Sequence, residues 1–279
     1  MKNLSMFCLS LYPEHLNNLK KINYIPVGLG KNNFNNEWLR DNTKENISNK
    51  NKYYGEYTFH YWFWKNMVDD ISDKQWIGFC AYRRYWANHN NMKSNELNKI
   101  VNNQNFQEHV LQDVKNDWSN YETILGERIP FGKIKLSKII KNGGIKSILR
   151  NLNSFIKNQT TVKFHFDIFH GNEKIDKAID LLEIKERSDF RIFINNQSFN
   201  KENMFICRSK KIIKEYYNSV FPWLQRCENI FGFNLNAWHE IRIYAFLAER
   251  YLSYWFNKYT IVKEWPIFFY DTKKNNLKL

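Results

Sequence analysis

The chain has 279 residues, of which 43% are hydrophobic and 17% aromatic, and 42 Lys and Arg against 28 Asp and Glu give a formal net charge of +14. This composition excludes an intrinsically disordered chain, and the length fits one large α/β domain over 1–279. The positive charge predicts attraction to phosphate-bearing substrates, anionic lipid or nucleic acid. In a sequence rich in Lys and Asn, many of the basic side chains can equally be ordinary solvated surface residues.

The N-terminal region predicts the start of a β-α-β sheet. Residues 4–10 form a short apolar run that ends before Pro13, and residues 24–28 form a second one. The first run is too short for a signal peptide, and no apolar stretch approaches the roughly 20 residues that span a bilayer. The four cysteines show no Cys-x-x-Cys spacing, which argues against a zinc site or a disulfide scaffold. We therefore expect a cytoplasmic protein that at most lies on a membrane.

An aromatic helix and a buried strand follow. Residues 30–50 are polar and predict a loop, and Ser48 is a candidate cap for a helix over 50–67 with aromatic residues on nearly all faces. Residues 75–80 read as a central strand that leads directly into Arg83 and Arg84. Because ligands in open α/β sheets bind outside the carboxyl ends of strands, the two arginines indicate an anionic ligand, unless they are ordinary surface residues.

Residues 128–166 contain nine Lys or Arg residues, interleaved with aliphatic ones, and no Asp or Glu. Such a basic, amphipathic insertion is typical of a segment that lies on an anionic membrane surface. It is equally consistent with two ordinary helices, broken at Gly143-Gly144, that pack on a core.

The last third predicts helices over 173–184, 209–228 and 236–256 and strands over 203–207 and 260–266. Together with the N-terminal strands, these elements predict an α/β fold with a mixed central sheet flanked by helices.

Several enzyme classes lose support because their motifs are absent. The chain has no GxGxxG after a strand, no phosphate-binding GxxxxGK[ST], no HExxH and no GxSxG. A spaced set of polar and aromatic residues is present instead: Asp41, Asn46, Lys50, Asn51, Tyr54, Glu56, Tyr82, Arg83 and Arg84. A polar loop leading into a buried helix would deliver the side chains of its first part to the rim of a site at the sheet edge.

These residues lie in segments that resemble a bacterial capsular-polysaccharide glycosyltransferase family, long catalogued as a domain of unknown function. The segments read DNTKENISNKNKYYGEY, YWFWKN and AYRRYW, and near the C-terminus NMFI, FLAERYLSYWF and KEWP. The resemblance implies a fold similar to GT-A glycosyltransferases, a nucleotide-sugar donor held near the end of the first strand, where Ser10 stands, and a glycan or lipid-linked glycan acceptor. Three positions depart from the family pattern: Lys44 replaces Gly, Gly55 replaces Cys and Ala81 replaces His.

The same resemblance bears on metal use. Many GT-A enzymes carry a metal-binding DxD motif after the strand equivalent to 75–80, and here AYRRY occupies that place. Guanidinium groups can neutralise a diphosphate leaving group directly, so we expect no metal to be required, with Mn²⁺ or Mg²⁺ left open.

Since Ala81 cannot accept a proton, the general base must lie elsewhere. Glu240 and its neighbour His239 are our candidates, because they begin a helix after a polar loop and lie close to Arg242. Glu249 competes with them, although Glu249 and Arg250 within an apolar helix are better explained as a structural ion pair. Two other functions stay open: a catalytically inactive assembly partner, and a nucleic-acid-binding module, which the lack of a known recognition signature disfavours.

Overall fold

β1 (Leu4–Ser10) is a central strand with buried side chains on both of its faces. Met6 and Cys8 point to one face of the sheet and Phe7 and Leu9 to the other, and all four are buried. In the computed structural model, which describes residues 3–142, 144–157, 159–235 and 238–271, β1 pairs in parallel with β2 (Ile25–Gly28) on one side and β4 (Trp76–Ala81) on the other. The predicted β-α-β opening is confirmed.

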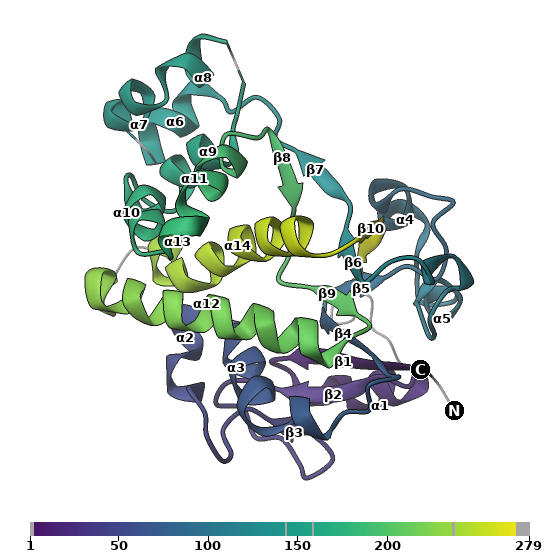
Figure 1. The fold of residues 1–279 in the computed structure, drawn as a ribbon. Helices are drawn as coiled ribbons and strands as arrows, with labels where there is room; N and C mark the ends of the chain where they lie inside the picture. The colour runs from purple at the N-terminus through teal and green to yellow at the C-terminus, as the bar shows by residue number, and fades with distance from the viewer. Residues whose placement is uncertain (1–2, 143, 158, 236–237, 272–279) are drawn as a thin grey trace.

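The central sheet is mixed, as predicted (Figure 1). Its main path runs, in order, through β10 (Val262–Trp265), β6 (Thr123–Gly126), β9 (Phe205–Cys207), β4, β1, β2 and β3 (Leu39–Arg40). β9 is antiparallel to both β6 and β4. The predicted closing strand is β10, which returns parallel to β6. Off this path, β5 (Arg84–Trp86) pairs with β4 and with β11 (Ile267–Phe269), and β7 (Arg128–Pro130) and β8 (Ser198–Asn200) form a separate pair.

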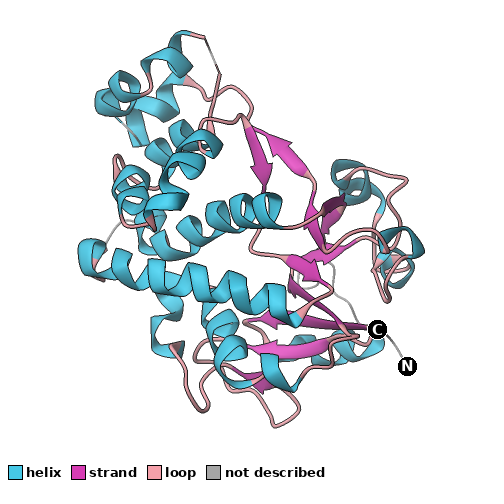
Figure 2. Ribbon diagram, viewed as in Figure 1, coloured by secondary structure: helices cyan, strands magenta, loops and turns pink. Residues whose placement is uncertain are grey.

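Helices cover both faces of the sheet (Figure 2), and each face has its own apolar core. Phe7 and Leu9 pack with residues of α2 (Asn51–Tyr54), α3 (Tyr57–Asn66), α12 (Lys210–Phe231) and α14 (Ile243–Tyr259). Met6 and Cys8 pack with residues of α1 (Leu16–Lys21), α4 (Ser94–Ile100) and α5 (Phe106–His109). Short 3-10 turns lie at Pro13–His15, Ser48–Lys50, Val68–Asp70 and Asn116–Trp118.

The aromatic helix is interrupted where the sequence predicted continuity. Gly55 adopts a φ of +55°, which ends α2 and lets α3 start two residues later, so the expected single helix over 50–67 is wrong. The expected Ser48 cap is also wrong, because Ser48 is the first residue of a 3-10 turn that Ile47 precedes, and no side chain caps either this turn or α2. α3 is largely buried, as expected.

The basic segment forms more helices than the two expected. They are α6 (Leu136–Asn142), α7 (Gly144–Arg150), α8 (Leu152–Ile156) and α9 (Val162–Phe169), and residue 143 lies outside the described residues. Figure 1 shows α6–α8 at one end of the molecule, away from β1–β3.

The C-terminal helices also differ in detail from the prediction. The helix expected over 173–184 is α10 (Lys174–Asp180), which α11 (Ile184–Phe193) follows. The helix expected over 236–256 is two helices, α13 (Trp238–Ile241) and α14, that meet at Arg242. Among the described helices, none is both long and apolar enough to cross a bilayer.

Candidate active site

The topology makes one edge of the sheet a candidate binding site. From β1 the chain builds β2 and β3 on one side and then returns to place β4 on the other, so the strand order reverses between β1 and β4. Parallel sheets leave a crevice outside the carboxyl ends of the strands at such a reversal. Here these ends are Ser10 and Ala81.

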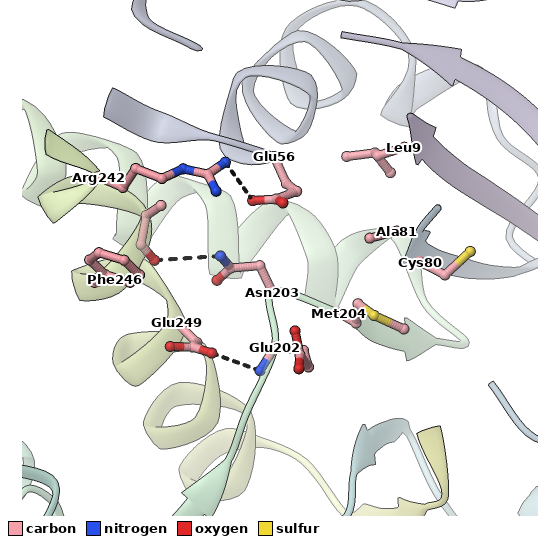
Figure 3. A pocket seen from close by; sticks show the side chains of 11 residues that line it. Leu9, Glu56, Cys80, Ala81, Glu202, Asn203, Met204, Arg242, Phe246 and Glu249 are labelled. Atoms are coloured by element: carbon pink, nitrogen blue, oxygen red, sulfur yellow. Dashed lines mark hydrogen bonds and ion pairs between the residues drawn. The ribbon is translucent and has the colours of Figure 1, made fainter. Parts of the chain in front are cut away.

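Two adjoining pockets occupy this edge. The arginine pocket, of about 350 Å³, includes Ser10, Tyr82, Arg83 and Arg84 in its lining. The carboxylate pocket, of about 150 Å³, has Asn203, Phe246 and Glu249 in its wall (Figure 3). The two pockets share the lining residues Leu9, Glu56, Ala81, Glu202 and Arg242. They can therefore hold two parts of one ligand.

A third hollow continues the arginine pocket. This open cleft, of about 950 Å³, shares Leu11 and Asn51 with the arginine pocket. Side chains from the polar loop, among them Arg40 and Asn42, line it together with Tyr53. The three hollows together extend along the carboxyl edge from β3 to β4.

A tight turn brings the predicted arginines into the arginine pocket. Arg84 pairs with Ala81 across the β4-β5 hairpin, which leaves Tyr82 and Arg83 in the turn. The Arg83 guanidinium lies over the Tyr82 ring, 4.8 Å from its centroid. Arg242, from the junction of α13 and α14, approaches Glu56 at 3.8 Å. Three guanidinium groups thus line one hollow, an arrangement suited to phosphate oxygens.

Glu202 lies at the boundary of the two pockets. Its carboxylate accepts a hydrogen bond from Arg84 Nε at 3.0 Å, and its side chain is 38% exposed, toward the hollows. Burial raises the pKa of this carboxyl, Arg84 opposes the rise, and the negative charge of Glu249 adds to it. A carboxylate with a raised pKa in a cleft is typical of a general base.

The backbone at Glu202 is strained. Its φ of +75° lies in the left-handed region, which a residue with a Cβ rarely adopts and which costs on the order of 1–3 kcal/mol. The Glu249 side chain accepts a hydrogen bond from the Glu202 N–H at 2.8 Å (Figure 3). This bond helps to hold the strained turn that presents Glu202 to the pockets.

Glu249 is in turn held by a buried cation. It forms an ion pair with Arg250, whose side chain is only 3% exposed, so the predicted pair is confirmed. Burial lowers the pKa of Arg250, and the adjacent Glu249 carboxylate opposes that shift. One carboxylate oxygen therefore faces Arg250 while the other holds the Glu202 backbone.

Six of the predicted donor-site residues line one pocket. They are Ser10, Asn51, Glu56, Tyr82, Arg83 and Arg84. Ser10 also bonds His15 Nδ1 at 3.0 Å, and the Asn51 amide donates to the Gly55 carbonyl at 3.0 Å. These residues come from β1, the aromatic helices and the β4-β5 turn, so the sequence motifs do converge in space.

The other four predicted donor-site residues lie outside these hollows. Lys50 and Tyr54 both bond the Glu228 carboxylate of α12, at 2.7 and 2.6 Å. Asp41 is fully buried, and burial raises the pKa of its carboxyl. Asn46 bonds within its own loop. Lys50 and Tyr54 therefore link this part of the chain to α12 and do not line the hollows.

Glu240, one of the two candidates for the general base on α13, is not among the lining residues of the three hollows. Glu240 pairs with Lys174 of α10 at 3.1 Å. The His239 side chain lies outside the described residues. Among the described residues, no group of three or more His, Cys, Asp and Glu is placed to hold a metal ion, and metal independence stays a prediction.

Glu202 and Asn203 were not predicted from the sequence to be site residues. They lie just before β9, separated from it by Met204, and because β9 is antiparallel to β4, its amino end lies beside the carboxyl end of β4. Two polar residues before a buried strand were the available signal, but the direction of that strand could not be read from the sequence.

Comparisons with known proteins agree with this fold. The model of a family described as a domain of unknown function (DUF4422) matches residues 12–260. No curated protein matches the sequence. A solved apo structure of the bifunctional glycosyltransferase WbbM is similar, with a TM-score of 0.67 at 18% identity over 96% of this chain and 45% of that one. The chain thus spans less than half of that protein, and the likeness concerns the fold.

Proposed function

The chain belongs to the DUF4422 family, and from that premise we propose that it is a glycosyltransferase that moves a sugar from a nucleotide-sugar donor to a surface-polysaccharide acceptor, such as a capsule or lipopolysaccharide glycan. One observation carries the proposal: a pocket lined by three arginines adjoins a pocket lined by three carboxylates, at the switch point of the sheet. The fold shared with a bifunctional glycosyltransferase and the resemblance of the sequence segments support it.

The three hollows suit the parts of such a donor. In our proposal the nucleoside lies in the open cleft, which offers amides and the Tyr53 ring, and the diphosphate lies in the arginine pocket. The sugar then reaches the carboxylate pocket, where Asn203 and Phe246 provide an amide and an apolar ring face. This order places the bond between sugar and diphosphate near Glu202.

The proposed step is a direct displacement. The acceptor hydroxyl oxygen forms a bond to the anomeric carbon of the sugar, and the bond from that carbon to the diphosphate breaks. Glu202 takes the hydroxyl proton, and the leaving diphosphate keeps the bonding electrons. Arg83, Arg84 and Arg242 stabilise the charge that develops on it.

The test is a transfer assay with a panel of nucleotide sugars and glycan acceptors, read by mass spectrometry. We expect one donor to be consumed, with release of its nucleoside diphosphate and a matching mass increase of the acceptor. Chelation of divalent ions should leave the rate unchanged. Salt-dependent retention on single-stranded nucleic acid, with no donor consumed, would instead favour a nucleic-acid-binding module.

Loss of either arginine of the β4-β5 turn should weaken donor binding. Arg83→Ala or Arg84→Ala is expected to lower nucleoside-diphosphate affinity roughly ten- to a hundredfold, about 1.5–3 kcal/mol, the scale of a charge-assisted hydrogen bond. Titration calorimetry measures this directly. Arg128→Ala is the matched control, because it removes the same charge from an exposed site on β7 beside Glu264. Wild-type affinity in both arginine variants would contradict the assignment.

The pH profile should report Glu202. A general base must be deprotonated, so kcat/KM should fall as the pH drops through the pKa of Glu202, which burial raises and Arg84 lowers. Arg84→Gln removes the lowering charge and should move the acidic limb to higher pH. The Arg83 guanidinium lies over the Tyr82 ring, so Arg83→Gln should weaken donor binding and leave the acidic limb in place. An unmoved limb in Arg84→Gln argues against Glu202.

A further inference from the structure

The basic helices repeat one apolar pattern three times. Residues 136–140, 145–149 and 152–156 read LSKII, IKSIL and LNSFI, each with large apolar residues at the first, fourth and fifth positions. In α-helices these positions share one side. The pattern predicts an apolar face of three large side chains on each of α6, α7 and α8, which is more than a single contact with the core would bury.

Only part of each face is buried. The fourth residues of the three repeats, Ile139, Ile148 and Phe155, lie in or against a small core with Phe164 and Ile168. The first and fifth residues point outward where they are described, between 46% and 69% exposed: Leu136, Ile140, Leu149, Leu152 and Ile156. A hollow of about 330 Å³ opens between α6 and α8, with Leu136 and Ile156 in its lining. Large aliphatic side chains gathered on a small helical unit mark an interaction surface.

The charge around these side chains selects the partner. Residues 128–166 carry nine basic and no acidic residues, and Lys133, Lys135, Lys146 and Lys157 are exposed. A second copy of the same face would bring like charges together. Single-stranded nucleic acid needs exposed aromatic rings for stacking, whereas the most exposed large side chains here are Leu and Ile.

We propose that α6, α7 and α8 dock the protein on an anionic lipid bilayer, with the exposed Leu and Ile side chains inserted below the headgroups and the lysines at the phosphate level. Aliphatic insertion and electrostatic attraction are the two contributions that interfacial helices combine. The unit lies at one end of the molecule, so it can contact a flat surface while the sheet stays clear of it (Figure 1). This inference is independent of the proposed transfer reaction.

Vesicle sedimentation of the full chain tests the proposal. We expect binding to vesicles of phosphatidylglycerol and phosphatidylcholine that weakens as salt rises, with little binding to pure phosphatidylcholine. Leu149→Ser with Ile156→Ser should weaken binding roughly tenfold or more, and Lys→Gln at positions 133, 135, 146 and 157 should do the same.

Matched variants elsewhere on the surface control for both changes. Ile184→Ser with Ile192→Ser removes two apolar side chains of α11 that are 81% and 69% exposed. Lys→Gln at positions 21, 74, 99 and 211 removes the same charge from other exposed lysines. Both control variants should bind as the wild type does, and thermal melts should show all four variants folded.

Three outcomes would overturn the proposal: equal binding to neutral vesicles, wild-type binding by the patch variants, or equal loss in patch and control variants. Light scattering, which measures the oligomeric state, can give a fourth outcome that overturns the proposal. A dimer that Leu149→Ser with Ile156→Ser abolishes, without vesicle binding by the wild type, would assign this face to self-association.

Discussion

Replacing Glu202 by Gln is expected to lower kcat by roughly 10²–10⁴-fold while nucleoside-diphosphate affinity stays near the wild-type value. The Gln amide has almost the same shape as the Glu carboxylate, but it cannot take the proton from the hydroxyl group of the acceptor. The Glu202–Arg84 contact is partly exposed, so its loss should change stability little. Turnover with a donor found by the panel, together with calorimetry, separates the two effects.

Glu240→Gln is the matched comparison for this variant. Glu240 was the sequence-based candidate for the base, and it pairs with Lys174 outside the pocket lining. We expect near-normal kcat in Glu240→Gln. If Glu240→Gln loses turnover and Glu202→Gln keeps it, the base lies on α13 and the assignment to Glu202 is wrong.

Replacing Arg250 by Met should destabilise the fold by roughly 3–5 kcal/mol, because it leaves the Glu249 carboxylate without its buried partner. The double variant Arg250→Met with Glu249→Gln should recover much of that loss, since no unpaired charge then stays behind. Denaturant unfolding measures both, with the slope checked for a change in the denatured state.

The exposed ion pair of Lys20 and Glu37 provides a control for the buried one. Both side chains are nearly half exposed, so Glu37→Gln should leave the free energy of unfolding almost unchanged. If Arg250→Met costs no more than Glu37→Gln, the Glu249–Arg250 pair does not hold the carboxylate that supports Glu202.

Local sequence patterns predicted the parts of the fold that depend on local chemistry. The strand over residues 4–10 is apolar on both faces, so it could be placed in the sheet without knowing which strands pair with it. Arg83 and Arg84 follow a buried strand, so they could be placed at its carboxyl end in the same way. The division of the aromatic helix could not be read from the pattern. It depends on the positive φ of Gly55. The Arg242 side chain, from a residue far along the chain, also packs so closely against Gly55 that a Cβ there would clash with it.

The site residues show the same limit. Lys50 and Tyr54 stand in the motif that resembles donor-site residues of the family, yet both bond Glu228, which is more than 170 residues away in the sequence. Glu202 meets Arg84 across 118 residues. Such contacts follow from how the strands are ordered and directed, and a single sequence does not contain that information.

The most direct test of the central claim is a thermal-shift panel of nucleoside mono- and diphosphates and nucleotide sugars, because a ligand that binds only the folded state raises its apparent stability. We predict a saturable rise in melting temperature for the diphosphates and sugar derivatives of one base, larger than for its monophosphate and diminished in Arg83→Ala. If no nucleotide raises the melting temperature, or if the rise is the same in Arg83→Ala, the arginine pocket is not a donor site and the glycosyltransferase proposal fails.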